Sequence, residues 1–188
     1  MSPTHISRWL AREVDLLQFS APTTCVYNPL IYARKPHEAY LKQHAKQGLD
    51  ALFLGMNPGP WGMAQTGVPF GEVGVVKDWL KITGDVVKPE NEHPKRLIEG
   101  LQCKRKEVSG RRFWEFFKGL CGTPENFTRH CLVYNYCPLS FMTKSGKNVT
   151  PPELKFEVRY QLFSLCDDAL CQVLDLFGIK KIVGLGRY

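Results

Sequence analysis

Three short apolar runs in the chain have the pattern of β-strands that are buried on both faces. They cover residues 51–54, 131–136 and 181–184. Each run lacks the polar alternation of a half-exposed strand, which favours a parallel sheet with helices on both faces. An extended segment at residues 25–27 precedes them. We therefore predict an α/β fold, and a chain of 188 residues suits a single domain.

Apolar residues recur at helical spacing in other segments. The predicted helices cover residues 4–18, 36–48, 73–80, 109–120 and 151–178. The last helix has the clearest start, because Thr150 can serve as its N-cap, proline follows, and Glu153 lies three residues after the cap. Gly178 is typical of a residue that ends a helix. For the helix at 109–120, Ser109 is the predicted N-cap.

The net charge adds more to this picture than the hydrophobic content does. The formal charge is +7, and a basic balance on a small domain suits an acidic partner, most commonly a nucleic acid. The densest basic cluster consists of Lys104, Arg105, Lys106, Arg111 and Arg112. This cluster is either a solvated loop or a face that contacts phosphate groups, and the residues alone leave both alternatives open.

Several classes of protein are disfavoured by the composition. The apolar runs are far too short to span a bilayer, so we expect no membrane segment. Arg8, Arg12 and Glu13 lie where a secretory signal would need apolar residues. The 7 cysteines form no Cys-x-x-Cys pair, which favours free thiols in a reducing compartment. Structural zinc is therefore not expected, and no metal site is predicted.

The segment 55–71, GMNPGPWGMAQTGVPFG, is the strongest candidate for an active-site loop. It follows a predicted buried strand, and ligands of open α/β sheets bind at the carboxyl ends of strands. Its glycines let the backbone approach a ligand with free N–H groups. The alternative is a surface turn whose aromatic residues plug the core. Irregular loops of this length in compact domains usually serve a function, which favours the first interpretation.

Two amide side chains follow predicted strands and can face the same crevice. Asn57 follows the first strand, and Asn135 lies near the end of the second. An amide offers an acceptor and two donors but no titratable proton. Beside an aromatic ring such as Phe70, it can read the edge of a planar heterocycle. Taken alone, Asn135 would be interpreted as a residue that ties down a turn. Together with the loop, we favour the ligand-binding role.

The loop sequence GMNPGPWGMAQTGVPFGEV, with YNYCPL downstream, closely resembles the single-strand-selective monofunctional uracil-DNA glycosylases. The resemblance extends from about residue 17 to residue 188. It includes YNP at 27–29, HPKR at 93–96 and VSGRRFW at 108–114. It implies the uracil-DNA glycosylase fold, which has three α/β/α layers and a central, mostly parallel, four-stranded sheet.

The resemblance also implies a function. Such an enzyme acts in DNA base-excision repair in the nucleus and hydrolyses the N-glycosidic bond of uracil. Its substrates would include 5-substituted uracils such as 5-hydroxymethyluracil, in single- and double-stranded DNA. We expect it to be a monomer that needs no cofactor.

The resemblance assigns a role to each candidate residue. Asn57 would be the catalytic residue that holds the attacking water, and Phe70 would stack on the flipped uracil. Asn135 would donate to O4 and accept from N3–H, a pattern that cytosine reverses. Backbone N–H groups near Met56 would bind O2. Gly59 stands where other uracil-DNA glycosylases carry a bulky Tyr, so it would leave room for a 5-substituent.

The chain departs from the family pattern at one point. Family members have a second motif, His-Pro-Ser-Pro-Arg-Asn, after a fourth strand, and it does not occur in these 188 residues. The histidines present, at 5, 37, 44, 93 and 130, lie outside such a motif. We therefore expect the last strand and helices to be missing, the sheet edge at 179–184 to be unpaired, and glycosylase activity to be weak or absent.

Two alternatives to the glycosylase stay open. The first is a catalytically inactive module that only binds DNA or the damaged base. The second is a phosphate-binding α/β enzyme that uses the loop as an anion cradle. The loop has neither a lysine nor a GxxxxGK pattern, which weakens the second alternative.

Overall fold

A parallel sheet forms the centre of the computed structural model, which describes residues 2–186. Its strand order is β3 (Cys131–Asn135), β2 (Ala51–Gly55) and β6 (Ile182–Gly184). The apolar runs predicted these three strands, but the predicted burial on both faces is wrong for β6, whose residues are exposed. Leu52 on the central strand pairs with Leu132 on one side and Ile182 on the other. The fourth strand that the resemblance implied is not among the described residues.

A second, antiparallel sheet was not predicted from the sequence. It has the order β1-β4-β5 and consists of Cys25–Tyr27, Ser140–Met142 and Asn148–Val149. The expectation of an extended segment at residues 25–27 is confirmed, but its partners were missed. Strands of three and two residues are too short for apolar and polar positions to alternate recognisably.

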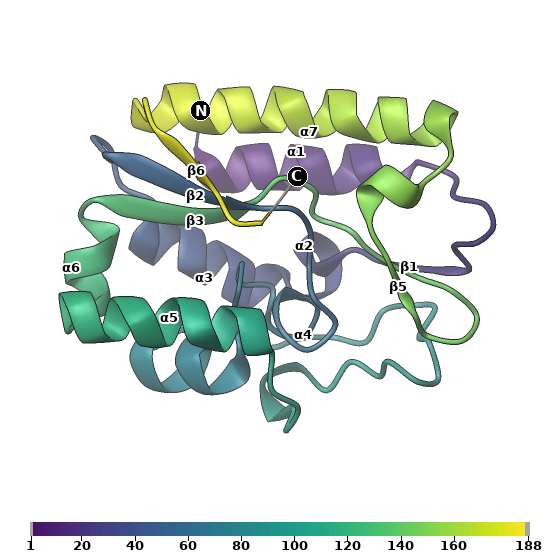
Figure 1. Ribbon diagram of the computed structural model, residues 1–188, viewed down its shortest axis with the longest axis horizontal. Coiled ribbons are helices and arrows are strands. Elements are labelled where there is room, and N and C mark those ends of the chain that lie inside the picture. Colours follow the sequence, from purple (N-terminus) through teal and green to yellow (C-terminus); the bar gives the residue numbers. More distant parts are fainter. Residues whose placement is uncertain (1, 187–188) are drawn as a thin grey trace.

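Helices cover both faces of the parallel sheet, as predicted. Figure 1 shows α1 (Pro3–Asp15) and α7 (Phe156–Phe177) on one face, and α5 (Val108–Cys121) and α6 (Pro124–Thr128) on the other. The helix α3 (Arg34–His44) runs along the edge strand β3. The shorter elements are α2 (Pro29–Tyr32), α4 (Met63–Thr66), the π-helical turn η1 (Val75–Trp79), and the 3-10 turns η2 (Gly100–Gln102) and η3 (Pro151–Glu153). The described chain therefore has three α/β/α layers.

The predicted start of the last helix is partly wrong. Thr150 does form the capping box with Glu153, but this cap begins the 3-10 turn η3 and not a long helix. The backbone then becomes extended at Leu154, with ψ 156°, and α7 begins at Phe156. The break coincides with burial of the Leu154 side chain in the core, where it is 6% exposed. The predicted end is confirmed, since Gly178 caps α7 in the left-handed conformation.

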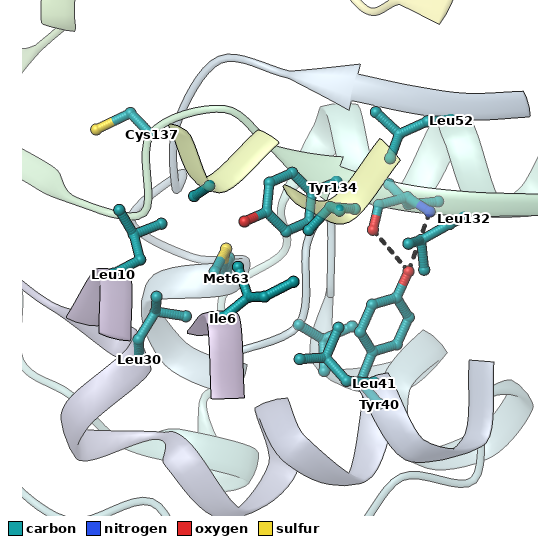
Figure 2. Packing of buried hydrophobic residues seen from close by; sticks show 14 of the residues in the cluster. Ile6, Leu10, Leu30, Tyr40, Leu41, Leu52, Met63, Leu132, Tyr134 and Cys137 are labelled. Carbon is teal, nitrogen blue, oxygen red and sulfur yellow. Dashed lines mark hydrogen bonds between the residues drawn. The ribbon is translucent and has the colours of Figure 1, made fainter. Parts of the chain in front are cut away.

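The two edges of the parallel sheet differ. At β3, the hydroxyl of Tyr40 donates to the carbonyl of Val133 at 2.8 Å and accepts from its N–H at 3.1 Å. Figure 2 shows this ring inside the apolar core, with both hydrogen bonds dashed. At the other edge, Ile182 and Val183 on β6 are 48% and 41% exposed. No described strand pairs with the outer side of β6, in agreement with the expectation for residues 179–184.

Candidate active site

The carboxyl ends of β2 and β3 open into a cavity of about 500 Å³. Because Gly55 lies opposite Asn135 in the parallel register, the segments that follow both strands emerge side by side. All residues that were predicted to bind or convert the base line this cavity, namely Met56, Asn57, Gly59, Phe70 and Asn135. The tertiary structure therefore brings together side chains from two segments that lie far apart in the sequence.

The ring of Phe70 lies directly against the backbone of the central strand. A Cβ atom on Gly55 would overlap this ring, and it would lie 2.5 Å from Oδ1 of Asn135. Phe70 itself has a positive φ of 55°, which is uncommon for a residue with a side chain. Its carbonyl accepts a hydrogen bond from Nε1 of Trp114 at 3.1 Å. Gly55 is therefore required for the ring and the amide to share one wall of the cavity.

Asn135 is buried, and half of its amide has no partner. Its Nδ2 donates to Sδ of Met63 at 3.2 Å, and sulfur is a weak acceptor. Its Oδ1 is fully buried and accepts no hydrogen bond within the described chain. Such buried unpaired atoms are rare and cost about 1–3 kcal/mol each. The amide therefore has an unused acceptor, beside an aromatic ring, for the edge of a ligand.

The orientation of Asn57 leaves its oxygen available. Nδ2 of Asn57 donates to the backbone carbonyl of Leu139 at 3.1 Å, so the amide nitrogen is the atom that faces the protein. Among the described residues, the backbone N–H groups of Met56 and Asn57 donate to no other backbone group. This corner of the cavity thus combines one side-chain acceptor with two free backbone donors.

Glu107 lines the same cavity and was missed by the sequence analysis. It corrects the predicted cap: Glu107, and not Ser109, is the N-cap of α5, and its side chain accepts from the Ser109 N–H at 3.2 Å. Its carboxyl group lies against the loop, since a Cβ on Gly59 would be 3.1 Å and one on Gly62 2.7 Å from Oε2. Burial raises the pKa of this carboxyl group, while hydrogen bonds from the backbone of Ser109 and Gly110 oppose the rise. Glu is not among the preferred N-cap residues, so the local sequence favoured Ser109.

The predicted basic cluster lies outside the cavity, whose lining includes none of its residues. Arg105 stacks on the ring of Trp61, at 5.0 Å from the centroid. Arg111 is held within α5 by an ion pair with Glu115, at 2.6 Å between Nε and Oε1. The remaining members are exposed, namely Lys104, Lys106 and Arg112.

The histidines also lie away from the cavity lining. His37 is buried, and its Nδ1 is 2.7 Å from the carbonyl oxygen of Gly67, at the end of the loop helix α4. Burial lowers its pKa to about 4, so this histidine is neutral at neutral pH. His93 is buried as well, with Nε2 at 3.1 Å from the carbonyl oxygen of Thr143. Both side chains therefore support loops and do not face the candidate site.

Two kinds of site are absent from the part of the chain that the structure describes. No three His, Cys, Asp or Glu side chains there gather closely enough to hold a metal ion. Within the same residues, none of the helices combines the length and hydropathy that a membrane crossing would need. The chemistry of the cavity therefore has to be argued from its amides, its aromatic rings, one carboxyl group and the backbone.

Among solved structures, the chain is similar to wild-type SMUG2 from Pedobacter heparinus. The TM-score is 0.51, and the match covers 97% of this chain and 86% of that one. The two sequences are 18% identical, so this likeness concerns the fold. The chain thus has the fold of the uracil-DNA glycosylases, and its cavity lies at the strand ends of the parallel sheet.

Relatives found by sequence similarity narrow the assignment further than the likeness in fold does. Single-strand selective monofunctional uracil-DNA glycosylases from Mus musculus and Rattus norvegicus are each 54% identical to this chain over 178 residues. The protein of that name from Bos taurus is 54% identical over 175 residues. The similarity to these glycosylases extends over 95% of this chain, which spans 64% of the length of the mouse relative. No family model matches the chain.

Proposed function

We propose that this protein is a monofunctional DNA glycosylase that hydrolyses the N-glycosidic bond between uracil and deoxyribose. The observation that carries the proposal is the pairing of Phe70 with the unused amide oxygen of Asn135 in one cavity. A flat ring with an adjacent donor and acceptor suits a planar base that has left the DNA stack. The names of the relatives support the same reaction.

In this proposal, Asn135 selects uracil against cytosine. Its Oδ1 accepts from N3–H of uracil, and its NH2 group exchanges the weak contact with Met63 for O4. Cytosine presents an acceptor at N3 and a donor at C4, so both contacts would become unfavourable. A good bidentate contact of this kind discriminates by about 1–3 kcal/mol.

The bond-breaking step relies on charge stabilisation and not on a general base. As the glycosidic bond breaks, negative charge develops on O2, where the free N–H groups of Met56 and Asn57 can stabilise it. The Oδ1 of Asn57 holds the attacking water, because its Nδ2 is engaged with Leu139. An amide cannot take the proton in a general-base step, so the sugar must already carry much of the positive charge when water attacks. Among the described residues no lysine lines the cavity, which agrees with a single hydrolytic step and no covalent intermediate on the protein.

The finer substrate range belongs to the same proposal. In this proposal Gly59 lies next to the position of C5, and the Glu107 carboxyl group is the neighbour there, since its Oε2 would lie 3.1 Å from a Cβ on Gly59. We therefore propose that 5-substituted uracils, including 5-hydroxymethyluracil, are accepted in both single- and double-stranded DNA. We further propose that the protein works as a monomer in the nucleus, where chromosomal DNA is repaired, and without a cofactor.

The test is the release of free uracil from a single-stranded oligonucleotide with one deoxyuridine. A parallel measurement compares the affinity for a strand with a non-cleavable fluorinated deoxyuridine and for a strand with deoxycytidine. Release of free uracil would confirm the proposed glycosylase activity. Preference for the uracil analogue without release would favour the alternative, a module that binds the damaged base and does not cleave. Equal affinity for both strands and no release would contradict the proposed function.

A further inference from the structure

The indole ring of Trp61 has two guanidinium groups close to it. The guanidinium carbon of Arg96 lies 5.1 Å from the ring centroid, and that of Arg105 lies 5.0 Å from it. Both distances are within the range of cation–π interactions. Trp61 belongs to the loop 55–71, and both arginines come from the segment between η1 and α5. We call these three side chains the Arg–Trp–Arg stack.

A buried glutamine fixes the two segments of the stack against each other. Gln65 is 0% exposed, and its side-chain amide uses all of its donors and acceptors on backbone groups. Its Nε2 donates to the carbonyls of Pro60 at 3.1 Å and Leu97 at 3.0 Å, and its Oε1 accepts from the N–H groups of Glu99 at 2.8 Å and Gly100 at 3.2 Å. The residue before Trp61 and the residue after Arg96 are therefore tied to one side chain. The stack is held in place before any ligand arrives.

The two guanidinium groups of the stack have no acidic partner among the described residues. The ion pairs there include Arg8 with Glu38 and Arg111 with Glu115, but none involves Arg96 or Arg105. The sequence neighbours add further positive charge, namely Lys95, Lys104 and Lys106. The carboxyl group of Glu107 lies nearby, against the loop 55–71, but neither arginine forms an ion pair with it, so the two cations favour a ligand with two anionic groups.

We propose that the Arg–Trp–Arg stack binds two phosphate groups of the DNA strand whose base enters the cavity. This inference rests on the proposed function and adds a binding site to it. Trp61 does not itself line the cavity, but it lies in the chain between Gly59 and Met63, which do, so the stack lies beside the cavity. Trp61 serves to hold the arginines and not to stack on a base, because guanidinium groups already occupy its ring. Preorganised arginines bind phosphate with little further loss of side-chain entropy.

The experiment measures binding of a fluorescent single-stranded oligonucleotide without uracil at several salt concentrations. Each phosphate contact contributes about −0.7 to the slope of log affinity against log salt for a single strand. R96Q and R105Q should each reduce the magnitude of the slope by about 0.7. The matched control is R129Q, which removes an exposed arginine that forms no ion pair with any described residue, and its slope should not change.

Two variants separate the stack from simple loss of charge. W61L removes the ring, and R96K keeps the charge but loses the planar guanidinium group. Both should weaken binding about two- to fivefold, the range expected for an exposed cation–π contact. Melting curves show whether W61L is folded, and R96K supplies the test if it is not. Equal slope changes in R96Q, R105Q and R129Q would overturn the proposal, and so would unchanged affinity in R96K.

The outcome is distinguishable from failure of the proposed function. The stack variants should lower the affinity for strands with and without the uracil analogue by the same factor. If the unaltered protein prefers the uracil analogue but the stack variants bind normally, the proposed phosphate-binding role of the stack is wrong and the glycosylase proposal stands. If binding depends on the stack but the analogue is not preferred, the protein binds DNA backbone without selecting uracil. If the unaltered protein binds no strand at all, both proposals fail.

Discussion

The floor of the cavity and the basic surface outside it, which we call the rim, are stabilised by different physical effects. The floor consists of Gly55, Phe70 and Asn135. Close packing and burial determine which residue each of these positions can hold. The rim consists of the Arg–Trp–Arg stack and the exposed members of the basic cluster. There, charge determines the interactions, and water competes with any ligand for the charged groups. Buried polar groups cost much when they lose a partner, whereas exposed charges contribute little each and depend on salt. Substitutions in the floor should therefore change stability or base selection, and substitutions in the rim should change the salt dependence of DNA binding.

The largest expected effect lies at Gln65, which ties the loop 55–71 to the segment that carries Arg96. Q65A leaves the N–H groups of Glu99 and Gly100 without their acceptor. Gly100 is buried whereas Glu99 is exposed, and the carbonyls of Pro60 and Leu97 lose their donor as well. At about 1–3 kcal/mol for each unpaired buried group, we expect a loss of about 3 kcal/mol in the free energy of unfolding. Urea denaturation measures it. Q102A is the matched control, because Gln102 is exposed on the same segment, and equal stability of the two variants would contradict the role of Gln65.

The next effect is a loss of stability at acid pH, and its cause is a buried histidine. The folded protein protonates His37 only at a pKa of about 4, whereas the unfolded chain does so near 6.5. The unfolded state therefore binds the proton more tightly, and stability is lost as the pH falls from about 6.5 to about 4. The loss approaches about 3 kcal/mol for this one histidine.

Unfolding free energies at pH 7 and pH 4.5 test this expectation. H37Q should flatten the pH dependence, and H5Q, which alters an exposed histidine, should leave it unchanged. Burial also lowers the pKa of His44 to about 4, so the slope that remains in H37Q is assigned to His44. A pH dependence in H37Q as steep as in the unaltered chain would exclude His37 as a cause.

A smaller effect, on selectivity, is expected at Asn135. N135A should lose about 1–3 kcal/mol of preference for the uracil analogue over deoxycytidine, the scale of a bidentate base contact. Its effect on unfolding should be smaller than that of Q65A, because Oδ1 of Asn135 has no partner to lose. Affinity measurements on both strands and urea denaturation check the two parts. N91A, at an exposed asparagine, is the control, and an unchanged preference in N135A would show that another group reads the base.

The smallest effect is expected at Arg111, in the rim. Its guanidinium group is already paired with Glu115 on the same helix, at 2.6 Å, so it has less to offer a phosphate group. R111Q should reduce the magnitude of the salt slope by less than the value of about 0.7 expected for one full single-strand contact. R112Q is the matched comparison, because Arg112 is the exposed neighbour on α5. E115Q should increase DNA affinity if the pair restrains Arg111, and no difference among the three variants would remove this distinction within the cluster.

Local patterns in the sequence determined the centre of the fold and several residues that line the candidate cavity. Continuous apolar runs identified β2, β3 and β6, and Gly178 ended α7 as its conformational freedom predicts. Because parallel strands end at the same edge of a sheet, Asn57 and Asn135 could be expected to meet. These inferences work because a buried strand such as β3 and a helix end each leave a signature within a few residues; β6 has the same apolar pattern although its residues are exposed.

Tertiary contacts alone decided the rest. The break at Leu154 depends on the core it enters, and the cap at Glu107 depends on a carboxyl group wedged against Gly59 and Gly62. The pairing of Arg96 with Trp61 depends on Gln65, which gathers backbone groups from two loops. No local pattern records such contacts, because each is set by the distance between segments that only the folded chain brings together.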